Sequence, residues 1–251
     1  MTKRIFIFLA VFFVFTSSVF AQAATIAVAA NMKDAFAEIA AEFKSTGKPE
    51  MRVVYGSSGN FAAQIMNGAP FSLFIAADEQ FPLELFKNGK TVDDGSVYAI
   101  GKLVIISKTS SGIHLLDSRA DIAKAIGKAN KVAIAKPELA PYGRAAVQYL
   151  KAEGLWDLAK DKLVYADNIG AATTYVASGA ADLGFTAFSL AKSPELLKQT
   201  SYVAVDTKMY EPIKQRMVLI KGASQEAQDL YRFMQGPKAK AILQKYGYST
   251  P

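Results

Sequence analysis

The stretch Tyr55-Gly56-Ser57-Ser58-Gly59-Asn60 joins a β-like run, 52–55, to a helix-like run, 61–66. A turn of small residues that opens a helix leaves several main-chain N–H groups without partners, and these groups face the same way. A helix start of this kind, with serine hydroxyls added, can hold an anion. Asn31 and Asn168 precede two further helix-like runs in the same manner. The sequence therefore predicts an anion site built from helix starts.

Short β-rich runs alternate with amphipathic helical runs along the rest of the chain. Several expected strands are apolar at consecutive positions, which is typical of parallel strands covered on both faces. The expected strands are 25–29, 52–55, 73–76, 103–107, 132–135, 163–165, 183–186, 202–205 and 216–220. The expected helices are 32–44, 61–66, 143–153, 169–178, 225–235 and 238–246. This alternation predicts an α/β architecture with parallel sheets.

The number of strands is too large for one small lobe, so we expect two. Crossovers between them are expected near Gly101 and over 209–212. The first lobe then comprises 24–101 and 213–251, and the second comprises 102–212.

Asn31 stands where the N-cap of the helix 32–44 belongs, because its side chain can accept a hydrogen bond from the first turn. The helix carries an apolar stripe, and Gly47 and Pro49 end it. Asn31 is therefore expected to cap this helix, to contact a ligand, or both.

The N-terminus has the pattern of a cleavable secretory signal over 1–23. Lys3 and Arg4 precede an apolar run, 5–15, and Ala21-Gln22-Ala23 supplies small residues at a cleavage site. The apolar run is short for a membrane span, although an uncleaved N-terminal anchor is the alternative. We therefore expect a periplasmic protein.

Composition excludes several classes of site. The chain has no cysteine, which excludes disulfides, a thiol nucleophile, a thiolate metal site and an N-terminal lipid-attachment cysteine. His114 is the single histidine and lies in a turn-like stretch, so it is expected to be a solvated loop residue. The formal net charge is +7, but the lysines are scattered. This pattern does not favour a nucleic-acid site, while a mild positive field can attract small anions.

Several motifs together resemble the molybdate-binding proteins of ABC import systems, and the resemblance covers essentially all of 24–251. The motifs are Val28-Ala29-Ala30-Asn31-Met32, Gly56-Ser57-Ser58-Gly59, the segment 68–78, Pro141-Tyr142-Gly143 and Tyr246-Gly247-Tyr248. The resemblance implies a type II periplasmic-binding-protein fold. Its two lobes, each a mostly parallel sheet flanked by helices, are joined by two crossover segments. They close on one tetrahedral oxyanion, molybdate or tungstate, which is delivered to a membrane permease. It also implies a monomer with no enzymatic activity and no resident cofactor.

By position, the resemblance implies five ligand-binding residues. They are Asn31, where many members have serine, the ligand serine Ser58, the main-chain donors Ala77 and Ile169, and Tyr142. Molybdenum would be held as molybdate through these residues, with no direct coordination of the metal. One departure is Ala187, where several members have tyrosine. Tyr142 is a candidate to supply the missing hydroxyl, so the ligand set and the preference among oxyanions stay open.

These residue types suit a fully ionised tetrahedral dianion, which presents only acceptor oxygens. An amide NH₂, a hydroxyl, a phenol and free main-chain N–H groups are all donors. Hydrogen bonds to a charged group contribute roughly 1.5–3 kcal/mol each, so six would total on the order of 10 kcal/mol before the cost of closing the lobes. A rigid ring of donors set for molybdate would leave gaps around the smaller sulfate ion. Hydrogen phosphate needs an acceptor, and Asp78 and Asp167 near these loops keep phosphate open.

Two alternative functions follow from the same residues. A receptor for another anion is one: sulfate, phosphate, or a carboxylate solute that pairs with Arg144. A secreted serine hydrolase is the other, but Gly56-Ser57-Ser58-Gly59 lacks the G-x-S-x-G spacing and only His114 could serve as a histidine base. The sequence therefore favours a receptor over an enzyme.

Overall fold

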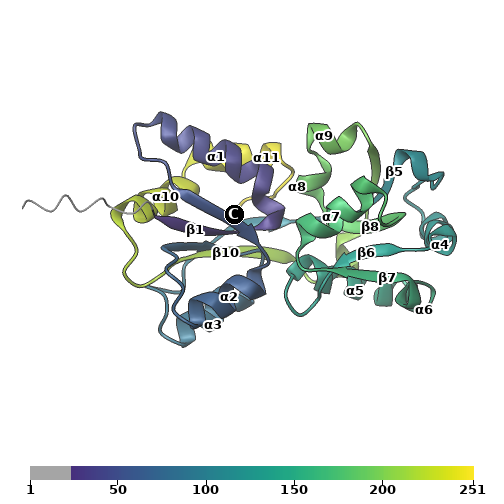
Figure 1. The fold of residues 1–251 in the computed structure, drawn as a ribbon, viewed down its shortest axis with the longest axis horizontal. Coiled ribbons are helices and arrows are strands. Elements are labelled where there is room, and N and C mark those ends of the chain that lie inside the picture. The colour runs from purple at the N-terminus through teal and green to yellow at the C-terminus, as the bar shows by residue number, and fades with distance from the viewer. Residues whose placement is uncertain (1–23) are drawn as a thin grey trace, which may run out of the picture.

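The computed structural model describes residues 24–251, which form two lobes, each a five-stranded sheet between layers of helices (Figure 1). The predicted secretory signal, 1–23, lies outside the described residues. Within 24–251, no helix combines the length and the apolar character that crossing a membrane requires.

The first sheet mixes parallel and antiparallel strands. In spatial order its strands are β2 (Arg52–Gly56), β1 (Thr25–Ala29), β3 (Leu73–Ile75), β10 (Ile213–Leu219) and β4 (Ser96–Gly101). Strand β1 runs parallel to β2 and β3, whereas β10 runs antiparallel to β3 and β4. One face is covered by α1 (Lys33–Ser45), α10 (Gln225–Gln235) and α11 (Pro237–Lys245), and the other by α2 (Ser58–Met66) and α3 (Gln80–Lys87) (Figure 1).

Helices cover both faces of this sheet because β1 is apolar at four consecutive positions, 26–29, and β3 is apolar throughout. Ile26 and Val28 belong to the core under α1 and α10, while Ala27 between them belongs to the core under α2. All three are fully buried. Burying a side chain the size of isoleucine contributes about 1.5–3 kcal/mol, so both helix layers are held by the strand between them.

The second sheet has the same mixed pattern. Its strands in spatial order are β7 (Leu163–Ala166), β6 (Val132–Ala135), β8 (Leu183–Ala187), β5 (Leu103–Lys108) and β9 (Thr200–Ala204). Strand β6 is parallel to β7 and β8, and β5 is antiparallel to β8 and β9. The helices of this lobe are α4 (Arg119–Lys128), α5 (Pro141–Ala152), α6 (Trp156–Ala159), α7 (Ile169–Ser178), α8 (Phe188–Ala191) and α9 (Pro194–Leu197).

The two-lobed α/β fold expected from the sequence is present, but the sheets are mixed rather than mostly parallel. The antiparallel pairs involve β4, β5, β9 and β10, the strands next to the segments that pass between the lobes. Strands of the first sheet lie within 24–101 and 213–251, and those of the second lie within 102–212. We call these parts lobe 1 and lobe 2; their boundaries inside the connecting segments remain a prediction.

The two connecting segments lie side by side. Gly101 pairs with Ile213 at the lobe 1 end of the crossing, and the Leu103 N–H donates to the Tyr210 hydroxyl at 3.1 Å. A register shift at Gln215 leaves Tyr98 without a paired residue on β10, which is a β-bulge. Bulges of this kind redirect side chains.

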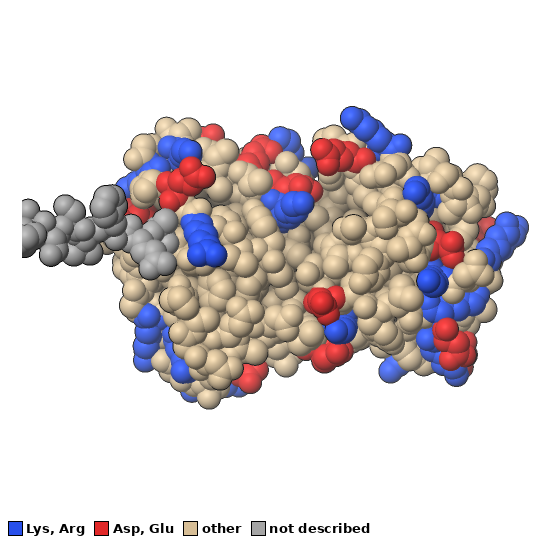
Figure 2. All heavy atoms as spheres, in the orientation of Figure 1, with Lys and Arg blue, Asp and Glu red and all other residues tan. Residues whose placement is uncertain are grey.

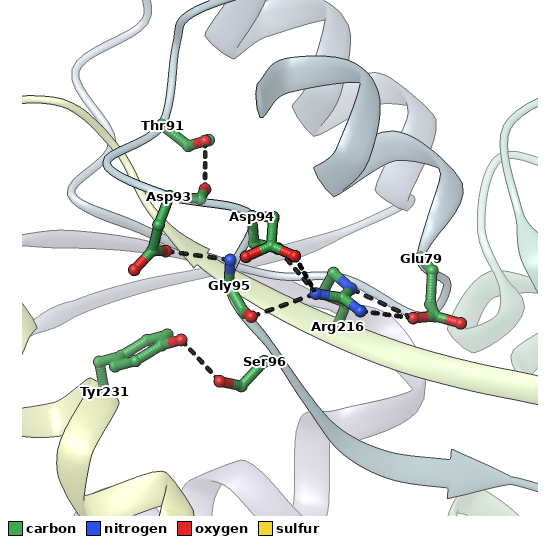
Figure 3. Close-up of polar contacts among 8 residues, drawn as sticks. All are labelled: Glu79, Thr91, Asp93, Asp94, Gly95, Ser96, Arg216 and Tyr231. Atoms are coloured by element: carbon green, nitrogen blue, oxygen red, sulfur yellow. Dashed lines mark hydrogen bonds and ion pairs between the residues drawn. The ribbon is translucent and has the colours of Figure 1, made fainter. Parts of the chain in front are cut away.

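Arg216 fixes β10 next to this bulge (Figure 3). Its guanidinium binds Glu79 Oε1 at 2.8 Å, beside the start of α3, and the main-chain oxygens of Asp94 and Gly95 at 2.9 and 3.1 Å. The side chain therefore ties β10 both to the turn before β4 and to the segment that follows β3.

Candidate anion-binding site

All five residues predicted to bind an anion line one small cavity between the lobes. Lobe 1 supplies Ala29, Ala30, Asn31, Gly56, Ser57, Ser58 and Ala77. Lobe 2 supplies Ala140, Pro141, Tyr142, Asn168 and Ile169. None of these lining residues carries a charged side chain. Asn31, Ser58, Ala77, Tyr142 and Ile169 are each less than 5% exposed. The cavity is therefore a buried site of uncharged polar groups.

Ser58 is the first residue of α2, so the helix starts three residues earlier than the sequence predicts. Ser57 is the N-cap, and its hydroxyl accepts from the Asn60 N–H at 3.4 Å. The Ala77 N–H donates to Ser58 Oγ at 2.9 Å. The Ala77 N–H, which was predicted to contact the ligand directly, is thus bonded to Ser58. The O–H proton of Ser58 is left to donate to a ligand.

Gly59 brings the lobes into contact beside the cavity. Its N–H donates across the boundary to the Leu139 carbonyl at 2.9 Å. A Cβ at this position would lie 2.9 Å from Leu139 Cα, which is closer than a side chain tolerates. The glycine in the Ser57-Ser58-Gly59 turn is therefore required for the closed arrangement of the lobes.

Lobe 2 contributes the starts of α5 and α7. Pro141 occupies the first turn of α5, so the Tyr142 N–H has no partner within the helix. Asn168 caps α7 as predicted, accepting from the Ala171 N–H at 2.9 Å, and Ile169 is the first residue of that helix. With α2, three helix N-termini meet at the cavity, and each contributes partial positive charge.

The phenol of Tyr142 points toward the crossover. Gln215 Nε2 donates to its oxygen at 3.1 Å, and a Cβ on Gly101 would lie 2.1 Å from the same oxygen. Burial raises the pKa of this phenol well above the ordinary value, so it stays neutral. Its hydroxyl therefore belongs to the crossover, and the main-chain N–H is the donor left for the cavity. Ala187, fully buried at the end of β8, does not line the cavity.

Asn31 does not cap α1, contrary to the sequence prediction. It lies in a short 3-10 helix, Ala30–Met32, and α1 begins at Lys33 without a side-chain cap. Its Nδ2 donates instead to Gln215 Oε1 at 2.9 Å and to the Tyr248 hydroxyl at 2.8 Å. Within 24–251, Asn31 Oδ1 is the single buried side-chain polar atom without a hydrogen-bond partner.

Asp78 and Asp167, the carboxylates considered as acceptors for the proton of hydrogen phosphate, lie outside the cavity lining. Asp78 of lobe 1 forms an ion pair with Arg144 of lobe 2, and the Phe81 ring lies 5.6 Å from that guanidinium. Burial raises the pKa of the Asp78 carboxyl, and Arg144 opposes part of the rise. Asp167 is exposed and pairs with Lys136. Arg144 is therefore already paired, which argues against a carboxylate solute.

The groups that a serine hydrolase, a metal site or a nucleic-acid site would need are not among the residues that line this cavity. His114 is exposed and does not line the cavity, so Ser58 has no histidine base beside it. Among the described residues, no group of three or more His, Asp or Glu side chains is placed to hold a metal ion. On the face shown in Figure 2, Lys and Arg side chains are scattered over both lobes, interspersed with acidic ones. No dense basic patch is visible there.

Sequence reasoning missed the buried residues behind the cavity: Gln215, Tyr98 and Tyr248. Gln215 stands between Lys214 and Arg216, so its neighbours in the sequence give no sign that it is buried. The predicted strand started after it, at 216.

Comparison with known proteins places the chain among solute receptors. Residues 24–249 match the family described as bacterial extracellular solute-binding protein. The molybdate-binding protein ModA of Azotobacter vinelandii is 40% identical over 233 residues, covering 91% of both chains. ModA of Rhodobacter capsulatus is 36% identical over 227 residues, covering 89% of this chain and 87% of that one. The solved structure of the A. vinelandii periplasmic molybdate-binding protein superposes with a TM-score of 0.80 at 36% identity, covering 91% and 99%.

Proposed function

We propose, since this chain belongs to the bacterial extracellular solute-binding protein family, that it captures molybdate or tungstate between its lobes. It then delivers the anion to the membrane permease of an ABC importer. The relatives at 40% and 36% identity are named molybdate-binding proteins, which supports this cargo.

The observation that carries the proposal is a buried cavity with donors and no charged side chain. Ser58 offers its O–H, and Tyr142 and Ile169 offer main-chain N–H groups at helix starts. Asn31 adds a side-chain amide whose NH₂ is bonded to Gln215 and Tyr248. Ala77 acts through Ser58. Such a set holds a dianion by hydrogen bonds and helix dipoles alone. The protein is thus a receptor without catalytic residues or a resident cofactor, and molybdenum is held as the oxyanion.

Size and protonation set the selectivity of this cavity. Fixed helix starts cannot close around sulfate as well as around the larger molybdate and tungstate ions. Hydrogen phosphate carries a proton that needs an acceptor, and the carboxylates of Asp78 and Asp167 are paired with cations away from the lining. We therefore rank molybdate and tungstate above sulfate and phosphate.

The cellular setting follows from the same proposal. Residues 1–23 direct export to the periplasm and are removed, and the mature chain acts as a monomer. Its partners are the oxyanion and the permease, and it does not bind nucleic acid.

Titration calorimetry of the purified protein with molybdate, tungstate, sulfate and phosphate tests the proposal. Submicromolar binding of molybdate or tungstate, with much weaker binding of the other two, is the expected result. A clear preference for sulfate or phosphate would overturn it.

A further inference from the structure

A buried polar network connects the two lobes behind the cavity, and Gln215 is at its centre. Gln215 is fully buried on β10. Its Oε1 lies 2.9 Å from Asn31 Nδ2 and 2.8 Å from the Tyr98 hydroxyl, and its Nε2 lies 3.1 Å from the Tyr142 hydroxyl. One amide therefore contacts a cavity residue of lobe 1, a strand next to the crossover, and a cavity residue of lobe 2.

The single proton of Tyr98 does not satisfy both of its contacts. The hydroxyl lies 2.8 Å from the Ala76 carbonyl oxygen, which can only accept. It also lies 2.8 Å from Gln215 Oε1, which can only accept as well. If Tyr98 donates to Ala76, the contact with Gln215 becomes favourable when the amide nitrogen of Gln215, rather than its oxygen, faces Tyr98.

Asn31 has the complementary mismatch. Both N–H groups of its amide are used by Gln215 and Tyr248, and its buried oxygen has no partner. Asn31 lines the cavity, and its oxygen is the end of the amide that Gln215 and Tyr248 leave free. An acceptor repels a fully deprotonated dianion but suits an oxyanion that carries a proton. The orientation of this amide therefore decides which chemical form of oxyanion the cavity accepts.

We infer that Gln215 is a positioning residue that sets which end of the Asn31 amide faces the anion. When both amides are reversed, Gln215 Nε2 donates to Asn31 Oδ1 and to the Tyr98 oxygen, and Gln215 Oε1 accepts from Tyr142. The Tyr248 hydroxyl, which donates to the Asn31 main-chain oxygen at 2.9 Å, turns its single proton to Asn31 Oδ1, and Ser189 Oγ remains the side-chain donor to that main-chain oxygen. Asn31 Nδ2 then becomes a donor toward the cavity. The reversal needs no change in packing, because the two ends of an amide are nearly equal in size. This inference rests on the proposed function and adds a selectivity for unprotonated oxyanions.

The Gln215→Glu variant tests this inference, because an ionised carboxylate has two acceptor oxygens and no donor. Asn31 must then keep its NH₂ on residue 215 and its oxygen toward the cavity. We expect the affinity for molybdate to fall roughly 10- to 100-fold, the equivalent of one charged hydrogen bond, while the affinity for hydrogen phosphate does not fall. Calorimetry at mildly alkaline pH, where phosphate retains one proton, measures both. Equal loss for the two anions, or unchanged molybdate binding, would overturn the inference.

Two further variants separate orientation from packing. Gln215→Met keeps the length of the side chain without its polarity, so it should lose less molybdate affinity than Gln215→Glu. The reverse ranking would count against the inference even if neither protein binds phosphate measurably. Gln148→Glu is the matched control, because the Gln148 amide contacts the Glu211 N–H outside the network, and its affinities should equal those of the wild type.

The wild-type protein offers a test that does not depend on whether a variant folds. The side-chain amide NMR signals of Asn31 and Gln215 should shift together when molybdate is added. A shift of Asn31 alone would overturn the coupling. If the wild type prefers sulfate, the proposed function fails, and the same comparisons with sulfate in place of molybdate still test Gln215.

Discussion

At the scale of single residues, a hydrogen-bond donor of the cavity is itself positioned by another hydrogen bond. The Ala77 N–H fixes Ser58 Oγ as an acceptor, so the one proton of that hydroxyl is left for the anion. A serine is suited to this position because it can accept and donate at once. Burial of both groups makes the arrangement rigid.

Ser58→Ala should therefore weaken molybdate binding by about 1–3 kcal/mol without unfolding the protein. Calorimetry measures the affinity and thermal denaturation confirms the fold. Ser118→Ala is the control: Ser118 caps α4 far from the cavity, accepting from the Asp121 N–H. That variant should lose about 1 kcal/mol of stability and keep its affinity. Equal affinities in wild type and Ser58→Ala would contradict the assigned site.

At the scale of elements, the crossover strand β4 is packed tightly against lobe 2. A Cβ at Gly101 would lie 2.1 Å from the Tyr142 hydroxyl and 2.5 Å from Gln215 Nε2. The end of β4 therefore has room only for glycine. This close approach lets the polar network reach from one lobe to the other.

Gly101→Ala should destabilise the protein by about 1–3 kcal/mol through overpacking and should also weaken molybdate binding. Gly127→Ala provides a matched control, because a Cβ at Gly127 in α4 would meet nothing within 4 Å. That change should stabilise the helix by roughly 0.5–1 kcal/mol and leave binding unchanged. Urea denaturation and calorimetry on both variants give the comparison; similar stability changes in the two would be evidence against the tight crossover.

The elements also show where sequence reasoning succeeds and where it stops. Strand β1, apolar after Thr25, and strand β6, apolar throughout, were predicted with their observed bounds, and so was α7 behind its Asn168 cap. Strand β4 was missed, since its six residues include Ser96 and Gly101 at the ends and lack a regular pattern. The partners of Asn31 lie 184 and 217 residues away, so local spacing favoured a cap that does not form. Contacts set by the closed lobes cannot be read from neighbouring residues.

At the scale of the whole molecule, the structure is a closed pair of lobes held on both sides of the cavity. On one side Arg144 of lobe 2 lies between Asp78 and the Phe81 ring of lobe 1. On the other, Ser189 Oγ of lobe 2 donates to the Asn31 carbonyl at 2.8 Å. These contacts exist only while the lobes are together. They therefore slow the opening of the lobes and the release of the anion.

Arg144→Gln should raise the dissociation rate of molybdate by about tenfold, because Asp78 would remain buried without its cation in the closed state. Stopped-flow displacement of molybdate by excess tungstate measures this rate. Lys160→Gln is the control, since Lys160 pairs with Asp157 on the surface of lobe 2 alone and should not affect release. An unchanged rate in Arg144→Gln would show that this ion pair does not hold the lobes closed.

Stability should fall in alkaline solution because the folded protein holds tyrosine protons that the unfolded chain loses. Burial raises the pKa of Tyr55 and Tyr149 to about 12, and that of Tyr98 and Tyr142 well above the ordinary value of 10.0. Their contribution is complete below pH 10 and declines as the pH rises through 12. Urea denaturation at several alkaline pH values should show this decline, with a shallower slope for Tyr149→Phe. A free energy of unfolding that stays constant across this range would contradict the prediction.

The paired connecting segments restrict how the two halves can separate. Gly101 and Ile213 are paired in the register of β4 and β10, and the Leu103 N–H donates to the Tyr210 hydroxyl just beyond them. Two paired connecting segments resist twisting far more than they resist bending. We therefore expect lobe 1 and lobe 2 to separate by rotation about a single axis. One pair of spectroscopic labels, with one label on each half, would then follow the entire swing.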